Sequence, residues 1–327
     1  MKKDIKNILV TGAAGQIGTE LTVALRRRYG AENVVAADKR DRPSGDFRVP
    51  GPYQIIDVTD VAGVEAVVRQ HDIDTVFHLA AILSATGEQD PQTCWHVNMN
   101  GTINVLEIAL RHDMTRVVIP SSIAVWGKGV PLLNTPQESV LKPATMYGVT
   151  KVCGELLGEY YVRRFGLDVR GLRFPGIISH ETPPGGGTTD YAVAIFYEAV
   201  DKGRYTCFVR EDTVLPMMYM PDAIRALVEL AEADFGRLRH HTDFNLAAVS
   251  FSAGELAGAI RRHLPAFEVS YEPDFHQAIA DSWPHSIDDS AAREEWGWKP
   301  EWDLEAMTAD MLAHLQARKA QGSLYAR

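Results

Sequence analysis

Short runs of apolar, often β-branched residues alternate with longer stretches of helical periodicity over the first 175 residues of the chain. Runs such as "VVIP" are apolar on both faces, as expected of strands that helices cover on each side. The stretches between them predict helices over about Gln16–Arg28, after Asp60, through "CWHVNMNGTINVLEIAL" and over about Tyr147–Phe165. This alternation predicts an α/β fold with a doubly wound parallel sheet.

The pattern loosens after Gly176, where a Pro- and Gly-rich segment runs to Gly187 and the later elements are short and mixed. We therefore expect two parts, residues 1–175 as the sheet domain and residues 176–327 as a smaller substrate-binding lobe, with chain crossings between them. In open α/β sheets, ligands bind at the carboxyl ends of the strands. A small lobe over that edge would form a cleft, which is the expected position of a substrate site.

The formal net charge of −10 argues against a nucleic-acid partner, because phosphate backbones require a basic face. The sequence has no apolar run of about 18 residues to predict a membrane span, and "MKKDIKNILV" lacks the apolar core of a signal peptide. Its three cysteines, Cys94, Cys153 and Cys207, fit neither a disulfide framework nor a zinc site. We expect a reduced, cytoplasmic protein without a bound metal.

The segment "TGAAGQIG" places Gly12, Gly15 and Gly18 between the first predicted strand and the first predicted helix. The first two glycines let the backbone turn and approach a pyrophosphate, and Gly18 lets the helix pack closely on the sheet. The helix N-terminus then faces the phosphates with its N–H groups and its dipole. The segment therefore predicts a dinucleotide site.

Asp38 stands twenty residues after Gly18, at the end of the second predicted strand. Its carboxylate can accept hydrogen bonds from the adenosine ribose hydroxyls and repels the 2′-phosphate of NADP, which favours NAD. The basic residues Lys39, Arg40 and Arg42 follow directly, and cations at this place could tolerate that phosphate. NAD is the predicted cofactor.

A second motif, "MYGVTK", places Tyr147 and Lys151 four residues apart on one face of a predicted helix. A phenol normally titrates near ~10, and a neighbouring ammonium lowers this pKa toward the range of a useful base. Upstream, "PSSIAVWG" ends a predicted strand with two hydroxyls, of which Ser122 or Ser121 could hold a substrate hydroxyl. The alternative is that the tyrosine and the lysine lie on the helix surface and the serines form a turn.

Together, "TGAAGQIG", "HLAA", "SSIAVWG" and the Tyr-Gly-Val-Thr-Lys segment resemble the extended short-chain dehydrogenase/reductases, in the sugar-nucleotide epimerase/dehydratase branch. The resemblance spans nearly the whole chain and implies a Rossmann fold. It also implies Tyr147 as the catalytic acid/base, Lys151 as its partner and ribose ligand, and Ser122 as the orienting hydroxyl. The further cofactor contacts that it implies are Gln16, Ile17, Lys39, Asp57, Val58, Leu79, Ala80, Ala81, Asn98 and Ile177.

Longer stretches of the sequence resemble one particular group of enzymes within this branch. The segments "LAAILSATGEQDP", "PGIISHETPPGGGTTDYAVAIFYEA" and "IADSWPHSIDDSAAREEWGW" are similar to the short-chain-type L-threonine 3-dehydrogenases. These enzymes oxidise the 3-hydroxyl of L-threonine with NAD to L-2-amino-3-oxobutyrate, a step of threonine catabolism. A sugar-nucleotide epimerase or dehydratase with the same triad is one alternative, and a non-catalytic NAD-binding regulatory module is another. The complete triad argues against the module, and the segments "GGGTT" and "DSWP" argue against the epimerase.

The carboxylate of a small substrate needs hydrogen-bond donors at the expected cleft. Ser84 follows a predicted strand at this edge and offers one hydroxyl. In "PPGGGTTDYA", Gly187, Thr188 and Thr189 could add backbone N–H groups and hydroxyls, because glycine-rich loops form concave anion sites. The same loop could instead be a spacer between the two lobes. Trp283 could close the pocket over the substrate or could be a packed core residue.

The helix through Trp95 and the helix that begins near Tyr147 could pair with a second copy of the chain across a two-fold axis. The family resemblance implies a homodimer of this kind, joined through a four-helix bundle. The same apolar residues could also belong to the internal core, and the sequence does not separate the two arrangements.

Overall fold

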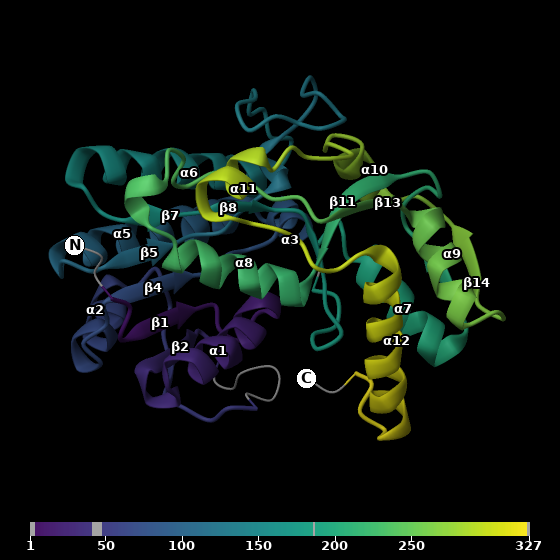
Figure 1. The fold of residues 1–327 in the computed structure, drawn as a ribbon, viewed down its shortest axis with the longest axis horizontal. Coiled ribbons are helices and arrows are strands. Elements are labelled where there is room, and N and C mark those ends of the chain that lie inside the picture. The colour runs from purple at the N-terminus through teal and green to yellow at the C-terminus, as the bar shows by residue number, and fades with distance from the viewer. Residues whose placement is uncertain (1–3, 41–47, 186, 326–327) are drawn as a thin grey trace.

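The computed structural model describes residues 4–40, 48–185 and 187–325 of the 327-residue chain, so Arg42 and Gly186 lie outside the described residues. Its centre is a six-stranded sheet of order β3–β2–β1–β4–β5–β7, in which all neighbouring strands are parallel (Figure 1). The strands are β1 (Ile8–Thr11), β2 (Val34–Asp38), β3 (Tyr53–Ile55), β4 (Thr75–His78), β5 (Arg116–Val118) and β7 (Val169–Arg170). The predicted α/β fold with a parallel sheet is confirmed.

Two layers of helices cover this sheet. They are α1 (Gln16–Tyr29), α2 (Val61–Gln70), α5 (Gly101–Arg111), α6 (Met146–Phe165) and α8 (Met220–Glu232), whereas α3 (Ser84–Gln89) and α4 (Pro91–Trp95) pack against α6, and a π-helical turn at His96–Asn100 lies between α4 and α5. Helices α2, α5 and α6 share a buried cluster with Val35 and Val117 of the strands. Helices α1 and α8 share another with Ile8 and Val118. Each face of the sheet is therefore buried, as the apolar strand runs require.

Helix α6 carries the predicted Tyr–Lys pair and begins at a well-defined cap. The Thr145 Oγ1 accepts the Gly148 N–H at 3.0 Å, which satisfies one N–H group of the first helical turn. Gly148 leaves no room for a side chain, because a Cβ there would lie 2.1 Å from the Ala124 carbonyl oxygen. The helix is thereby fixed against the segment that follows β5, and it ends at Gly166 in the left-handed conformation.

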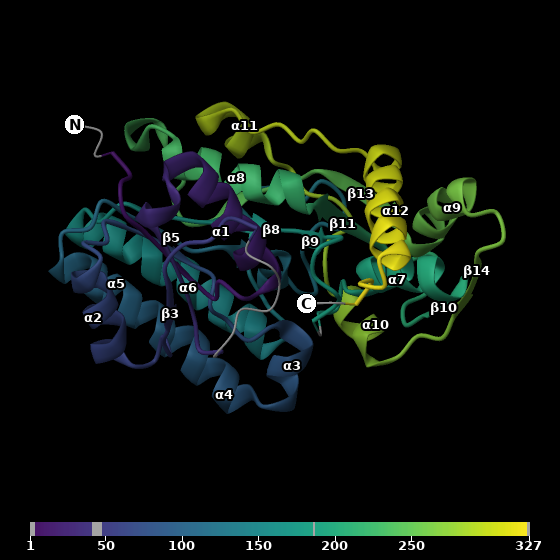
Figure 2. The ribbon, with the colours of Figure 1, turned by 90° about the horizontal axis from the view of Figure 1, so that it is seen from below.

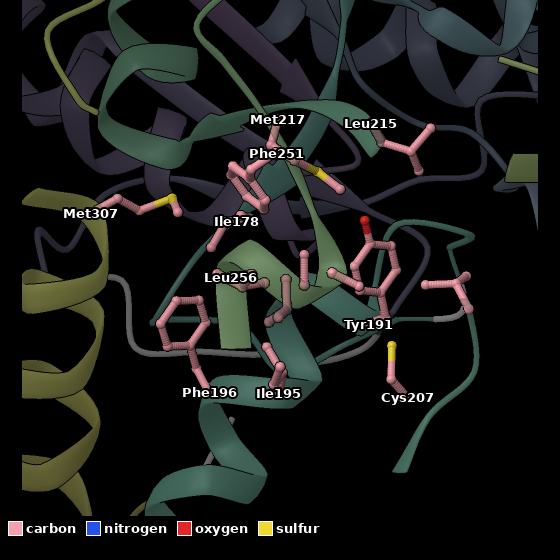
Figure 3. Packing of buried hydrophobic residues seen from close by; sticks show 14 of the residues in the cluster. Ile178, Tyr191, Ile195, Phe196, Cys207, Leu215, Met217, Phe251, Leu256 and Met307 are labelled. Carbon is pink, nitrogen blue, oxygen red and sulfur yellow. The ribbon is translucent and has the colours of Figure 1, made fainter. Parts of the chain in front are cut away.

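The second part of the chain forms small sheets and helices beside the main sheet (Figure 2). Its buried cluster includes Tyr191, Phe196, Phe251 and Met307, which Figure 3 shows packed together. The strands of the small sheets are β6 (Ser121–Ser122) and β8 (Leu172–Phe174) from the first part, and β9 (Gly176–Ile178), β10 (Arg204–Cys207), β11 (Val214–Tyr219), β12 (Phe244–Asn245), β13 (Val249–Ser252) and β14 (Glu268–Tyr271) from the second. The helices are α7 (Tyr191–Lys202), α9 (Ala253–His263), α10 (Phe275–Ala280), α11 (Ser290–Trp296) and α12 (Leu304–Ala320), and short 3-10 turns cover Ala31–Asn33, Ile123–Val125 and Phe235–Arg237.

The chain crosses between the two parts more than once. Helix α8 packs against α1, and Phe244 of β12 and Trp298 belong to the same buried cluster as Leu21 of α1. Residues after position 175 thus supply part of one layer over the main sheet. A buried core is therefore shared across the predicted boundary at residue 175. The division into residues 1–175 and 176–327 stays a prediction.

All three cysteines are free thiols, and Cys94 and Cys207 are buried. Burial raises the pKa of the Cys207 thiol to about 11, so this sulfur is protonated at neutral pH. Among the described residues, no helix has both the length and the apolar character needed to cross a membrane.

Candidate active site

Two adjoining cavities lie at the carboxyl ends of the main-sheet strands and share Gly12, Gly15, Leu79 and Ala81. Their volumes are about 230 Å³ for the first, catalytic cavity and about 240 Å³ for the second, which lies beside β2. The catalytic cavity brings together the predicted residues Gln16, Ile17, Gly18, Ser84, Ser121, Ser122, Tyr147, Lys151, Ile177, Gly187, Thr188, Thr189 and Trp283. The second cavity adds Asp38, Lys39, Asp57, Val58 and Ala80. Residues from both parts of the chain thus meet in one site.

Gly12 and Gly18 make the turn between β1 and α1 too tight for side chains. Gly12 has a φ of 67°, and a Cβ at this position would lie 2.7 Å from the Ala80 nitrogen. A Cβ at Gly18 would lie 2.2 Å from the Gly12 carbonyl oxygen. Helix α1 begins here without a side-chain cap, and its first residues line the catalytic cavity. A turn without side chains, followed by a helix N-terminus, can accommodate the pyrophosphate of a dinucleotide.

Asp38 is held by its neighbours in the second cavity. Its Oδ2 accepts the Ala14 N–H at 3.1 Å, and its Oδ1 accepts the Arg40 N–H at 3.1 Å and the Arg40 Nε–H at 3.0 Å. Burial opposes ionisation of this carboxyl, but the hydrogen bonds from Arg40 outweigh it and the pKa of Asp38 is lowered. Asp38 is therefore a carboxylate at neutral pH, as contact with ribose hydroxyls requires. Arg40, which could have bound a phosphate, is paired with this carboxylate.

Tyr147 and Lys151 lie one turn apart on α6, with the Lys151 Nζ 5.4 Å from the centre of the Tyr147 ring. Lys151 donates to the Pro120 carbonyl oxygen at 2.7 Å, which holds the ammonium near the end of β5. Burial raises the pKa of Tyr147 to about 12, although a hydrogen bond with Ser122 lowers it. Burial also lowers the pKa of Lys151 to about 8, against the attraction of Glu155. A buried phenol next to a cation can act as a proton acceptor, because the pKa of the phenol falls when a further positive charge approaches.

The two serines of β6 contact different partners. Ser122 hydrogen-bonds Tyr147, whereas Ser121 donates to the buried carboxylate of Glu155. Glu155 in turn makes a buried ion pair with Arg173 at 2.8 Å. Ser122 is thus the hydroxyl beside the Tyr147 phenol, and Ser121 lines the same cavity with its hydroxyl bound to Glu155; the role of either in holding a substrate stays a prediction.

The loop before α7 reaches the catalytic cavity. Thr188 is buried, and its Oγ1 lies 3.3 Å from the Ser84 Oγ at the start of α3. Asp190 accepts hydrogen bonds from the Gly185 and Gly187 N–H groups at 2.7 and 2.9 Å. The Gly187 N–H, which we expected to face the substrate carboxylate, thus has an internal partner. The described residues Gly187–Asp190 thus form part of the cavity wall, and their role in holding a substrate stays a prediction.

Trp283 is packed in the buried cluster of the second part and also lines the catalytic cavity, so both of its expected environments are present. The cavity wall contains further residues that the sequence analysis did not single out, namely Leu83, Ile123, Phe174, Pro175 and Asp190. The apolar ones carry no sequence signal that separates a cavity wall from a core. Asp190 could have been noticed as an acid directly after the glycine-rich loop.

Asn98 and His78 lie behind Lys151, around a small cavity of about 20 Å³. Asn98 stands in the π-helical turn, where its amide accepts the Ile82 N–H at 2.8 Å and donates to the Ile82 carbonyl at 3.1 Å. It orients the segment after β4, and its direct contact with a cofactor stays a prediction. His78 bonds the Thr11 hydroxyl through Nδ1 at 2.8 Å, and burial lowers its pKa to about 3. His78 is therefore a neutral residue at physiological pH.

Comparison with known proteins agrees with this geometry. The sequence pattern of the NAD dependent epimerase/dehydratase family matches residues 8–247, which include the glycine turn, Asp38 and the Tyr–Lys pair. The chain belongs to this family. A member from Staphylococcus saprophyticus, described as an uncharacterized epimerase/dehydratase, is 47% identical over 96% of this chain and 98% of its own.

Two solved structures are similar over nearly their whole length. An L-threonine dehydrogenase from Clostridium difficile is 48% identical, with a TM-score of 0.94 over 97% of this chain and 99% of that one. The holo form of an L-threonine dehydrogenase from Cupriavidus necator is 50% identical, with a TM-score of 0.92 over 94% of this chain and 99% of that one. The Rossmann-type fold of the epimerase/dehydratase branch and the use of NAD, both expected from the sequence, are confirmed.

We expect Asp38→Ala to weaken NAD binding and to improve the binding of NADP relative to NAD. The change removes a charged acceptor, and hydrogen bonds to charged groups contribute about 1.5–3 kcal/mol, or roughly ten- to a hundredfold in Kd. It also removes the repulsion of a 2′-phosphate, while Arg40 stays at the site. Titration of both cofactors against the one variant measures the effect. A parallel loss for NAD and NADP would contradict the role of Asp38.

Proposed function

We propose that this family member is an L-threonine 3-dehydrogenase, which oxidises the 3-hydroxyl of L-threonine to give L-2-amino-3-oxobutyrate. One observation carries the proposal: the Ser84–Thr188 hydroxyl pair lies in the same cavity as Tyr147, Lys151 and Ser122. This places donors for a carboxylate opposite a proton acceptor for a hydroxyl. The cavity of about 230 Å³ also has to admit the nicotinamide, so the remaining space suits a small substrate. Similarity to the two L-threonine dehydrogenases supports the same substrate.

The mechanism assigns proton handling to residues of this chain. NAD, when bound, supplies the oxidised nicotinamide that accepts a hydride from the substrate carbon. Tyr147, as the phenolate, accepts the proton of the 3-hydroxyl, which Ser122 holds in position. Lys151 is cationic below its pKa of about 8 and stabilises that phenolate, while the Pro120 carbonyl keeps the ammonium in place. Holding the reacting groups together supplies much of the acceleration.

The two ends of threonine require opposite charges from the cavity wall. Ser84 and Thr188 can donate hydrogen bonds to the carboxylate from the β4 and α7 sides. Asp190 is the only acid among the described residues that line this cavity, and it offers the negative charge that an ammonium group needs. Thr189 and Trp283 complete the wall around the small side chain. The pocket is thereby polar at two places and apolar elsewhere, which is the usual form of a small-molecule site.

Thr188→Val should raise the KM for L-threonine more than it changes the Kd for NAD. The substitution keeps the shape of the side chain but removes a buried hydroxyl, which leaves the substrate carboxylate short of a donor; we expect about a tenfold increase in KM. Steady-state kinetics with each substrate varied in turn measures this difference. Thr206→Val is the matched control, because the Thr206 hydroxyl bonds Ser270 on the surface between β10 and β14. Equal effects on both substrates would count against a carboxylate contact.

The assay that tests the function mixes the purified protein with NAD and L-threonine and follows NADH formation. We expect turnover that depends on both compounds, and 2-amino-3-oxobutyrate as the product. UDP-glucose and UDP-galactose are tested in parallel, since an epimerase would interconvert them without net NADH formation. Conversion of the sugar nucleotides without turnover of threonine would establish the epimerase instead. NAD binding without turnover of any of these compounds would favour a regulatory module.

We infer that the protein forms a homodimer through the helices that carry the catalytic pair. Trp95 of α4 is 41% exposed, and Leu156 and Tyr160 of α6 are 65% and 54% exposed. Helices α4 and α6 contact each other, so these apolar side chains lie on adjacent helices. Their exposure on these two helices supports an interaction surface there. Light scattering should give the mass of two chains, and Leu156→Glu should give the mass of one.

A cytoplasmic location remains part of this proposal. Its support is that all three cysteines are free, which agrees with a reducing compartment. The net charge of −10 further supports the absence of a nucleic-acid partner.

A further inference from the structure

We propose that His180, Asp310 and His314 form a binding site for a divalent transition metal, with Zn²⁺ as the expected ion. Their ligand atoms all lie within 4.8 Å of one another, and no other His/Cys/Asp/Glu group of the described residues is arranged in this way. His180 follows β9, whereas Asp310 and His314 lie one turn apart on α12. None of the three lines the catalytic cavity. The site therefore does not depend on the proposed function.

Two short separations occur at the cluster, one to the neighbouring Glu181 and one between two of its own ligand atoms. The His180 Nε2 lies 3.2 Å from the Glu181 Oε1, and the His314 Nε2 lies 3.7 Å from the Asp310 Oδ1. In a tetrahedral site with bonds of about 2.0–2.1 Å, neighbouring ligand atoms are about 3.3 Å apart. Glu181 lies outside the three-residue cluster, so water would complete the coordination of the ion. Two imidazoles and one carboxylate are donors that Zn²⁺ and Co²⁺ accept.

Residues behind the ligands orient them. The Tyr219 hydroxyl donates to the Asp310 Oδ2 at 2.6 Å and lies 2.8 Å from the His180 Nδ1. Because the Tyr219 proton is directed to Asp310, the His180 Nδ1 carries a hydrogen and donates to Tyr219. The Nε2 faces the Glu181 carboxylate at 3.2 Å and becomes a metal ligand only when it leaves that contact. Arg318 donates to the carbonyl oxygens of His180 and Glu181 at 2.6 and 3.1 Å, which fixes this segment.

Two contacts have to change when the ion binds. The His180 imidazole has to exchange the Glu181 Oε1, which Arg48 also contacts at 2.5 Å, for the ion. The His180 and His314 rings are stacked, with centres 3.9 Å apart and an angle of 7° between their planes. Because ring nitrogens bind metals in the plane of the ring, one ring has to rotate. The His314 side chain is 49% exposed and has solvent beside it into which it can turn.

The ion would tie the segment after β9 to helix α12. Ile177 of β9 lines the catalytic cavity, and the intervening Ser179 donates to Glu20 of α1 at 2.6 Å. A metal at His180 therefore joins α12 to a segment that contacts the sheet domain. Because binding to the folded state alone stabilises it, we expect Tm to rise by about 4 °C at roughly a hundredfold excess of Zn²⁺ over its Kd.

The test uses tag-free protein titrated with ZnCl₂ in a calorimeter and with CoCl₂ in a spectrophotometer. We expect one equivalent of either metal per chain, and for Co²⁺ the intense visible absorption of a tetrahedral site. His314→Ala should weaken binding by at least about 100-fold, since even residues behind metal ligands change affinity by 10–100-fold. Asp310→Asn is a second variant that keeps the volume of the side chain and should also weaken binding. Thermal unfolding of each variant without metal shows whether it is folded.

His263→Ala is the matched control. His263 is also partly exposed on a helix, and its Nε2 lies 3.0 Å from the Glu305 Oε1, but it lies outside the cluster. This variant should bind Zn²⁺ as the unmodified protein does. Folded His314→Ala protein that binds Zn²⁺ with unchanged affinity would overturn the proposal. An equal loss of Zn²⁺ affinity in the His263→Ala variant would also overturn the proposal, because it would indicate binding to scattered surface histidines.

Discussion

Tyr147→Phe should reduce turnover of L-threonine by about 10²–10⁴-fold while the protein still binds NAD. The substitution removes one oxygen, the atom that hydrogen-bonds Ser122 and accepts the substrate proton in the proposed mechanism. The ring remains to fill the cavity wall next to Lys151. Single-turnover NADH formation measures the chemical step, and a fluorescence titration with NAD measures binding.

Tyr160→Phe is the control, because Tyr160 lies on the same helix outside the catalytic cavity and phenylalanine keeps the aromatic ring at the proposed dimer surface. This variant loses the same atom and should turn over threonine at the normal rate. A Tyr147→Phe variant with unmodified turnover would remove Tyr147 from its role. If both variants were equally slow, the cause would be a general effect on α6 rather than the loss of the proton acceptor.

The pH dependence gives a second readout of the same residue. Because burial raises the pKa of Tyr147 to about 12 in the absence of cofactor, the phenol is neutral at pH 7 and the accepting form increases with pH. We therefore expect kcat/KM to rise with pH up to about pH 8, where Lys151 begins to lose its charge. Lys151 is cationic below about pH 8, where its charge favours the phenolate. Lys151→Met should shift the rise to higher pH, and an unshifted profile would argue against that support.

Gly18→Ala should abolish tight NAD binding, with a loss of about 10²-fold or more, because displacements near 1 Å in a site have effects of that size. The new Cβ would lie 2.2 Å from the Gly12 carbonyl oxygen and 2.8 Å from the Ala13 Cα. Both contacts are backbone atoms, so the turn itself has to move away from α1. That turn is the part of the site that fits a pyrophosphate. Titration with NAD, together with thermal unfolding, separates lost binding from lost folding.

Gly258→Ala in α9 is the matched control for this prediction. A Cβ there would meet nothing within 4 Å, and alanine is favoured over glycine inside a helix by about 1 kcal/mol. The control should bind NAD normally and should be slightly more stable. Normal NAD binding by a folded Gly18→Ala variant would show that the close packing of α1 on the turn is unnecessary.

The features that the sequence predicted well are those made by residues close together in the chain. The turn at Gly12 and Gly18 is local, because the positive φ of Gly12 and the first turn of α1 involve neighbouring residues. Tyr147 and Lys151 are fixed one turn apart by the period of a helix. Asp38 is placed by the end of a short buried strand. Each of these follows from backbone geometry that a few residues determine.

Other features depended on which distant segments the fold brings together. The proposed choice of Ser122 over Ser121 rests on Glu155, which lies on α6 and takes the Ser121 hydroxyl. The pairing of Ser84 with Thr188 joins α3 to the loop before α7. The Asp190 contact, which occupies the expected Gly187 N–H donor, is short in sequence but requires a loop conformation that composition does not specify.

The amino-acid sequence by itself determined the parallel α/β fold, the dinucleotide turn and the Tyr–Lys pair, because periodicity and spacing encode local geometry. Only the tertiary structure decided the cavity wall and the His180–Asp310–His314 cluster, whose first member is far from the other two in the chain. From the sequence we expected no metal site. The spacing of cysteines and histidines along a chain indicates a metal site only when the ligands are near each other in sequence. Long-range contacts depend on how the chain crosses between its two parts, and no short stretch of residues specifies that path.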